Sequence, residues 1–426
     1  MRQYNQQMSR LIDQFFSQEK KLLALIVAGG IALRFFAVLY VAHTPYSDEL
    51  AYRSMALNLI SGRGIIDHMG NYAMYNVGYS LFVLSPGFLI AGNNLFLVRI
   101  LNILLGGIAI ILCYGIAKES GAGKIGRVLA AAFWAFYIPA NVYAVYLAKE
   151  NLMIPLMLLV LWFSVRLVRN PSYLMAAGCG ISLGFLALTG NSGLVLIFVV
   201  ALAVFFSKVE FGKKLSLVLL IMVSMLAIAS PWVIRNWSVL GSPVLNTNFG
   251  FNLYLGNNPS ATGEFVSISD TPQGGVWDEL RSQSEIVASE ALRNEALAWI
   301  RENPDKFLDL AWRKAGYFWM PPVHQGESEQ SNVEALARTI WAIQFFLLIG
   351  AAAGTIFCSK LRQNNAVRMM WLAVVGYTTV HMLFYVIVRY REPIMPFLCI
   401  MAALAIESVL VKFDSATKGA PMHRSS

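Results

Sequence analysis

The chain has 426 residues, of which 57% are hydrophobic and only 13% are charged. Soluble domains carry roughly 25% charged residues, so this composition excludes an ordinary soluble globular protein. The formal net charge of +9 does not indicate nucleic-acid binding, because the lysines and arginines stand in small groups between apolar segments rather than in one basic patch. We therefore expect contacts with membrane lipids and none with nucleic acid.

The apolar residues fall in runs long enough to cross a bilayer, which takes ~20 residues per helix. We predict an all-α polytopic membrane protein, a bundle of about ten transmembrane helices. The predicted spans are 22–42, 95–116, 128–147, 151–168, 173–190, 192–206, 215–232, 336–357, 369–388 and 394–411. Segment 77–91 is also apolar, but it is short and contains Ser85-Pro86-Gly87. A span there would invert every later loop, so we predict an interfacial or re-entrant element.

The placement of basic residues predicts the orientation, because cytoplasmic loops carry an excess of lysine and arginine. With the N-terminus inside, most basic residues between the spans lie on the cytoplasmic side. The short outer segments hold only Arg53, Arg63, Lys149, Arg389 and Arg391. The pattern predicts an integral membrane protein whose working face is the non-cytoplasmic one.

These boundaries divide the chain into parts with different expected environments. The outer loop 44–94 is expected to bear interfacial helices, and the loop 233–335 is expected to form a small α-rich subdomain with a helix near 282–300. The full division is a cytoplasmic N-terminus 1–21, a seven-span module 22–232, the outer subdomain 233–335, three further spans in 336–411 and a cytoplasmic tail 412–426.

Acidic residues stand at the outer ends of two spans. Asp48 and Glu49 follow the first span, where Ser47 can cap a helix and both acids suit its positive end. An acid held at a helix start is also rigid enough to act as a base. Glu150 lies in the turn between the third and fourth spans, where it serves either as a second catalytic acid or as the ion-pair partner of Lys149.

Basic residues recur at the same outer level, against the orientation rule. Arg235 follows the seventh span, and Arg389-Tyr390-Arg391 closes the ninth. Arginine suits a phosphate because its planar fork makes paired, charge-assisted hydrogen bonds, so Arg235, Arg389 and Arg391 are candidates for binding a donor phosphate. The alternatives are anchoring to lipid headgroups and, for Arg391, pairing with Glu392.

A segment rich in asparagine and glycine, 246–263, opens the large outer loop, with Phe249, Phe251 and Tyr254 interleaved. Amides and aromatic faces suit the hydroxyls and apolar faces of a sugar, although a tight multi-turn loop has the same composition. The candidate contacts to a sugar or acceptor are Asn252, Tyr254, Asn257 and Asn258. No histidine or cysteine pair has metal-ligand spacing, so no metal site is predicted.

Taken in order, these features resemble one known family. They are the acidic pair after the first span, Gly-Tyr-Ser at 78–80, the second acid, Pro-Trp-Val-Ile-Arg-Asn at 231–236, the Gly-Phe-Asn-Leu-Tyr-Leu-Gly-Asn-Asn-Pro run at 250–259, and Arg-Tyr-Arg-Glu-Pro at 389–393. Over residues 24–411 the chain resembles the GT-C membrane glycosyltransferases. The nearest branch is that of the protein mannosyltransferases and lipid A aminoarabinose transferases, glycosyltransferase family 39-like.

The resemblance implies a GT-C bundle and an enzyme that transfers a single hexose or pentose from a polyprenyl-phosphate donor, with inversion, outside the membrane. The acceptor would be a glycan, lipid A or a protein. No cofactor is required. Some relatives bind a divalent metal, but no spacing here indicates one. By position, Asp48 matches the family's principal acid and presumed base, Glu49 its neighbour, and Glu150 the acid of the second loop.

The resemblance also assigns the basic residues. Arg389 and Tyr390 match the Arg-Tyr pair near the last outer turn, where donor phosphate is expected, and Arg235 matches the arginine after the seventh span. The chain departs from the pattern in one place. Many relatives have prolines before Gly-Tyr-Ser, whereas this chain has Tyr75-Asn-Val-Gly78. The resemblance therefore does not predict the shape of the acceptor-binding side.

Two other classes of protein handle lipid-linked sugars. A transporter or flippase predicts charges lining the midplane and interrupted helices in paired halves, but only Arg34 lies that deep and no internal repeat is seen. An O-antigen polymerase or ligase would use a diphosphate-linked oligosaccharide and would differ mainly in its outer arginines.

Overall fold

The computed structural model describes residues 18–321 and 331–419, with side chains as far as 413. The predicted cytoplasmic ends, 1–21 and 412–426, therefore lie largely outside the described residues. Within the described part the chain is helical, and its one β feature is an isolated bridge between Glu264 and Val386. The predicted all-α polytopic membrane fold is confirmed.

Each predicted span overlaps at least one helix. The main overlapping helices are α2 (Glu19–Tyr40), α5 (Leu95–Glu119), α6 (Lys124–Ala135), α8 (Glu150–Arg169), α9 (Tyr173–Thr189), α10 (Leu196–Phe206), α11 (Phe211–Leu240), α16 (Asn332–Phe357), α18 (Asn365–Met382) and α19 (Met395–Gly419). Six helical segments of the described chain are long and apolar enough to span, or seven if one bent pair counts as a span. The helices α9, α10 and α18 fall short of that standard.

The third predicted span, 128–147, is wrong as one straight helix. The helix α6 ends at Ala135, and α7 (Ile138–Val142) with the 3₁₀ turn η2 (Tyr143–Val145) continues at an angle of 58°. Pro139 lies in the first turn of α7. The helix is broken just before this proline, because Tyr137 has extended backbone with a ψ of 120°, whereas the first turn of a helix tolerates proline. The bend aims Tyr143 and its neighbours toward the functional end of the bundle.

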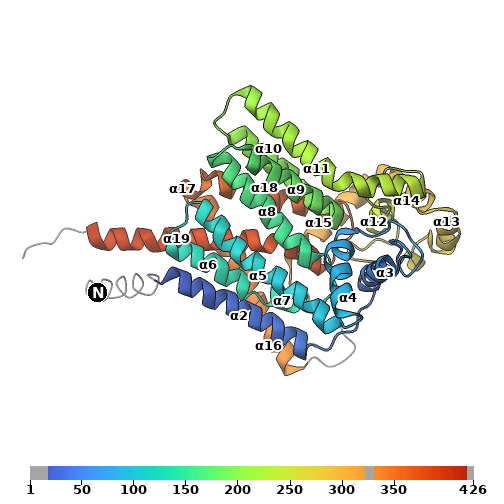
Figure 1. Ribbon diagram of the computed structural model, residues 1–426, viewed down its shortest axis with the longest axis horizontal. Coiled ribbons are helices and arrows are strands. Elements are labelled where there is room, and N and C mark those ends of the chain that lie inside the picture. The colour runs from blue at the N-terminus through green and yellow to red at the C-terminus, as the bar shows by residue number, and fades with distance from the viewer. Residues whose placement is uncertain (1–17, 322–330, 420–426) are drawn as a thin grey trace, which may run out of the picture.

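The core of the membrane module surrounds the start of α19. Every residue from 391 to 405 is buried, and the helices α5, α6 and α16 pack around it. The helices α2 and α11 lie on the periphery of the bundle (Figure 1) and leave most of their apolar side chains exposed. This arrangement suits helices whose outer faces meet lipid tails.

Several shorter helices gather at one end of the bundle, opposite the start of α2 (Figure 1). They include α3 (Asp48–Ile60), α4 (Ser85–Ala91), α12 (Phe249–Gly256), α13 (Trp277–Gln283), α14 (Glu285–Glu302) and α15 (Pro304–Trp319). The predicted helix near 282–300 is thus present as α14. The segment predicted to be interfacial forms a short helix, Ser80–Ala91, which packs on α3 and α5 at this end.

Glycine lets α9 and α11 pack backbone to backbone. A Cβ atom added to Gly180 would lie 2.4 Å from the carbonyl oxygen of Ile221, and Gly184, one turn later, is equally confined. Small residues four apart allow this close approach where lipid supplies no hydrophobic driving force between helices. The contact holds α11, which leads into the outer subdomain, against the rest of the module.

We predict that Gly180→Ala destabilises the protein by about 1–3 kcal/mol, the usual cost of overpacking. Gly350→Ala is the matched control, because a Cβ added to Gly350 meets nothing within 4 Å. Thermal unfolding of the purified protein in detergent measures the difference. Equal midpoints for the two variants would contradict the close α9–α11 contact.

Candidate active site

Three segments that are distant in sequence bring two acids and one arginine together. Asp48 is the first residue of α3, Glu150 the first residue of α8, and Arg389 lies in the 3₁₀ helix η6 (Val388–Ile394). Arg389 donates a hydrogen bond from Nη2 to Asp48 Oδ2, and its Nε lies 3.9 Å from Glu150 Oε1. Both carboxylates stand at helix starts, which stabilise negative charge. We call Asp48, Glu150 and Arg389 the charged triad.

The members of the triad differ in exposure. The side chains of Asp48 and Arg389 are 26% and 25% exposed, whereas that of Glu150 is 3% exposed. Glu150 is therefore fixed in place, and Asp48 can meet a reactant from outside. The alternative in which Glu150 pairs with Lys149 is not the one observed, because the ion pair of Glu150 among the described residues is with Arg389.

The backbone just before Asp48 is strained. Ser47 has φ of 49°, and it is the one non-glycine residue of the described chain with a positive φ. Such a conformation costs roughly 1–3 kcal/mol and persists only where the surroundings impose it. The predicted cap is wrong in one respect, because Ser47 occupies the capping position of α3 but its side chain makes no capping hydrogen bond.

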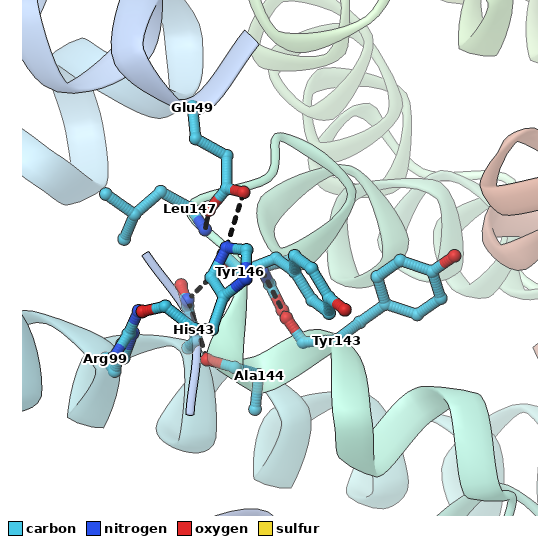
Figure 2. Close-up of polar contacts among 9 residues, drawn as sticks. His43, Glu49, Arg99, Tyr143, Ala144, Tyr146 and Leu147 are labelled. Atoms are coloured by element: carbon cyan, nitrogen blue, oxygen red, sulfur yellow. Dashed lines mark hydrogen bonds and ion pairs between the residues drawn. The ribbon is translucent and has the colours of Figure 1, made fainter. Parts of the chain in front are cut away.

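Glu49 turns away from Asp48 into the protein. Its Oε1 lies 2.6 Å from Nε2 of His43, and its Oε2 accepts a hydrogen bond of 2.7 Å from the backbone N–H of Leu147 (Figure 2). Arg99 in turn donates to the carbonyl oxygen of His43. Both oxygens of the buried Glu49 are thus engaged. The geometry favours a role in which Glu49 positions the loop that carries Asp48.

A large cavity of about 750 Å³ opens beside the triad. Asp48 and Arg389 line it together with Tyr143 and Tyr385. Much of the remaining wall is apolar: Val41, Ile138, Pro139, Val142, Trp341, Ile387 and Val388. We call it the apolar cavity.

A second cavity of about 280 Å³ lies on the other side of Tyr385, which lines both. Glu150 and Tyr390 face it. Its wall is rich in amides: Asn76, Asn191, Asn246, Asn248 and Asn252. We call it the amide cavity, and the charged triad stands between it and the apolar cavity.

Arg235, a predicted phosphate ligand, lies elsewhere. It donates to the carbonyl oxygens of Tyr72, at 2.9 Å, and Ile65, at 2.8 Å, and its guanidinium stacks over Trp232. It lines neither the apolar nor the amide cavity. Through these hydrogen bonds Arg235 holds the first outer loop against α11.

Arg391 is also structural. Its side chain is fully buried and donates to the carbonyl oxygens of Phe318 and Met320 at 2.9 and 2.8 Å. Its Nε lies 4.0 Å from Glu392 Oε1, so the alternative pairing is present. Of the three predicted phosphate arginines, only Arg389 faces the cavity that Asp48 lines.

The predicted sugar contacts divide in the same way. Asn252 lines the amide cavity. Tyr390, a predicted ligand of the donor phosphate, lines it as well, and its hydroxyl donates to that of Tyr385. Asn257 and Asn258 are fully buried, and their amides donate to backbone carbonyls. The buried Tyr254 accepts a hydrogen bond from a backbone N–H. These last three residues hold the segment that follows α12 and do not line the amide cavity.

Sequence reasoning missed some residues of the site. Tyr385 stands in no recognised motif, and His43 was one of several scattered histidines. The amides Asn76 and Asn191 carried a weak signal, because each lies at the outer end of an apolar segment. Within residues 18–321 and 331–419, no group of three or more His, Cys, Asp or Glu side chains has the arrangement of a metal site.

Comparisons with known proteins agree with this architecture. Residues 79–235 match the family model described as dolichyl-phosphate-mannose-protein mannosyltransferase. The oligosaccharyltransferase AglB of Archaeoglobus fulgidus, solved with an inhibitory peptide and a dolichol-phosphate, superposes with a TM-score of 0.55 at 12% identity. The match covers 96% of this chain and 52% of AglB, so the chain spans about half the length of that protein. The apo form of the archaeal enzyme gives the same TM-score at 12% identity and covers 93% and 51% of the two chains.

ArnT from Cupriavidus metallidurans, bound to undecaprenyl phosphate, has 17% identity over 84% of this chain and 76% of its own, with a TM-score of 0.44. No curated protein sequence matches the chain. The resemblance proposed from sequence is confirmed at the level of the fold: this integral membrane protein has the fold of the GT-C membrane glycosyltransferases.

A buried lysine ties the outer subdomain to the site. Lys314 in α15 is fully buried, and its Nζ donates to Oδ1 of Asn257 at 3.1 Å and to the carbonyl oxygen of Met382 at 3.4 Å. Met382 ends α18, just before the segment that leads to Arg389. Burial lowers the pKa of Lys314 from 10.5 to about 8, because a low-dielectric environment disfavours its charged form.

This shift predicts a pH dependence of stability. Between pH 8 and 10.5 the unfolded chain keeps the proton that the folded Lys314 has lost, so the contribution of this residue to stability rises with pH in that window. We expect the stability of the wild type relative to Lys314→Met to increase between pH 8 and 10.5 and to be flat from pH 6 to 7.5. Thermal unfolding of both proteins across this range measures it. A relative stability that falls above pH 8 would contradict the sign.

Proposed function

We propose that the chain is a glycosyltransferase that moves a single hexose or pentose from a polyprenyl-phosphate donor to a glycan, lipid or protein acceptor. The proposed site faces the periplasm of a bacterial inner membrane. The observation that carries the proposal is the position of the charged triad, between an apolar cavity and an amide-lined one. A transferase for lipid-linked sugars needs this combination, because its donor is a hydrocarbon, a phosphate and a sugar in series.

The donor is assigned to the two cavities by chemistry. The walls of the apolar cavity suit the first isoprene units, and Arg389 at its edge suits the phosphate. The amides of the second cavity suit sugar hydroxyls, since each amide both donates and accepts hydrogen bonds. The archaeal AglB structure, which shares the fold, holds a dolichol-phosphate, which supports a lipid phosphate as the donor class.

The triad suggests how a bound donor activates the base. Without a donor, Arg389 holds Asp48 in an ion pair and occupies its carboxylate oxygen Oδ2. A donor phosphate competes for the guanidinium, and we propose that Arg389 turns to the phosphate and releases Asp48. The buried Glu150 stays beside Arg389 and keeps it in reach of both partners.

In the proposed reaction the acceptor hydroxyl attacks the anomeric carbon from the face opposite the phosphate. The new glycosidic bond forms as the bond from carbon to phosphate oxygen breaks, and the electron pair leaves with that oxygen, so the configuration inverts. The hydroxyl proton passes to Asp48, a step worth about 10²–10⁴-fold. Arg389 stabilises the negative charge that develops on the departing phosphate. This scheme needs no nucleotide and no further cofactor.

We predict that Asp48→Asn lowers the rate of sugar transfer by at least about 10²-fold, because the amide cannot accept the proton. Asp309→Asn is the control: Asp309 is half-exposed on α15 and pairs with Arg313 at 2.9 Å. Membranes of a strain lacking the gene supply donor and acceptor, and mass spectrometry measures the product made by each purified variant. A wild-type rate for Asp48→Asn with unchanged folding would exclude Asp48 as the base.

Sidedness is tested by cysteine labelling in intact cells. Tyr46→Cys marks the site end, because Tyr46 is 63% exposed and lines the apolar cavity. Lys213→Cys marks the other end, where Lys213 is exposed near the start of α11. Both are made in a Cys358→Ser background, since the other cysteines, Cys113, Cys179 and Cys399, are buried.

An impermeant maleimide is expected to label Tyr46→Cys in intact cells whose outer membrane has been permeabilised. It is expected to label Lys213→Cys only after the inner membrane is broken. The reverse pattern would place the triad in the cytoplasm and overturn the proposed orientation.

A further inference from the structure

A third cavity, of about 200 Å³, lies between the first outer loop and the outer subdomain. Trp277 and Phe251 line it, with ring centroids 5.1 Å apart and planes inclined at 41°. Polar groups complete the wall, among them the side chains of Asn71, Arg281 and Glu285. Neither the triad nor the proposed donor sites use this cavity, which we call the aromatic cavity.

The aromatic cavity adjoins the amide cavity through a shared wall. Two chain segments form this wall, and consecutive residues along them face opposite sides. The pairs that divide between the aromatic and the amide cavity in this way are Tyr75 and Asn76, Thr247 and Asn248, and Phe251 and Asn252. A ligand that occupies the aromatic cavity therefore lies next to the proposed position of the transferred sugar.

Arg281 and Glu285 play different parts in this cavity. Glu285 accepts hydrogen bonds from the backbone N–H groups of Tyr72 and Ala73 and from the Thr247 hydroxyl, so it fixes the wall. Arg281 has no ion pair within the described part of the chain, and its hydrogen-bond contact is to the sulfur of Met69 at 3.8 Å. The guanidinium fork thus keeps donors free for a ligand.

We propose that the aromatic cavity binds one neutral sugar ring of the acceptor, which makes the acceptor a glycan of at least two sugar units. The inference rests on the proposed function and narrows its acceptor class. Aromatic faces pack against the apolar C–H face of a pyranose, and the arginine and amide groups bind its hydroxyls. The volume is below the roughly 300 Å³ at which pockets for drug-sized ligands begin, which suits a single ring.

Charge and connection to the triad support this assignment. Asp278 and Glu279, exposed on α13 beside Trp277, disfavour an anionic ligand. Tyr75, on the inner wall, packs edge-on against Tyr52 of α3 with centroids 5.8 Å apart. Tyr52 lies one helical turn after Asp48. Two packed tyrosine rings therefore link the wall of the aromatic cavity to the helix that begins at the proposed base.

The first test compares purified full-length variants in the transfer assay with membranes of the strain lacking the gene. Trp277→Ala and Arg281→Gln are each expected to raise the acceptor concentration for half-maximal rate about tenfold, which corresponds to ~1.4 kcal/mol, with little change at saturation. The matched controls are Trp312→Ala, since Trp312 is 80% exposed on α15, and Arg301→Gln, which is exposed at the end of α14. Equal effects in variants and controls would overturn the subsite.

The second test measures sugar binding directly by saturation-transfer NMR, with lactose, maltose and α-1,6-mannobiose as neutral probes and glucose 6-phosphate as an anionic one. We expect transfer to the ring protons of a neutral probe in the wild type and in Trp312→Ala, and none in Trp277→Ala. Binding of glucose 6-phosphate alone, or no Trp277-dependent signal from any probe, would overturn the proposal. A wild type that binds a neutral probe but transfers no sugar would contradict the proposed function and not the sugar-binding cavity.

Discussion

The contact of Arg389 with Asp48 and Glu150 is the interaction on which the functional end of the molecule depends. It joins the first outer loop, the start of α8 and the start of α19 at one point. Two carboxylates in a partly dry environment repel each other and resist losing water, and one guanidinium offsets both effects. An incoming phosphate would add negative charge that the single guanidinium does not offset. Because Glu150 is buried and Asp48 is partly exposed, Asp48 is the partner that an incoming phosphate would displace in the proposed reaction.

Several other charged side chains at this end of the molecule form hydrogen bonds with backbone groups. Arg235 and Arg391 each bind two carbonyl oxygens, and Glu49 accepts from a backbone N–H. Lys314 holds the end of α18 in the same manner. Charge-assisted bonds of this kind are stronger than neutral ones, so they fix loops that have little apolar surface. The outer loops are thereby rigid enough to define cavities.

The sequence predicts the depth of the site residues in the membrane but not the direction of their side chains. Hydropathy and charge bias give the depth of a residue in the membrane, and they placed Asp48, Glu150 and Arg389 at one level. They do not show the direction in which a side chain points around the axis of its helix. In the 3₁₀ helix η6, with three residues per turn, Arg389 points to the cavity and Arg391 into the core. The helix α12 was missed because glycine and asparagine are poor helix formers, and burial of Leu253 and Leu255 overrides that preference.

The exchange of Arg389 between Asp48 and a donor phosphate gives the proposed reaction an order, with the donor binding before the acceptor. While Arg389 is free of phosphate it binds Asp48, so an acceptor that arrives first meets a carboxylate already neutralised by its partner. In the proposed reaction, a donor that binds first would draw Arg389 away and leave the Asp48 carboxylate free to accept a proton. The same movement therefore couples donor binding to activation of the acceptor.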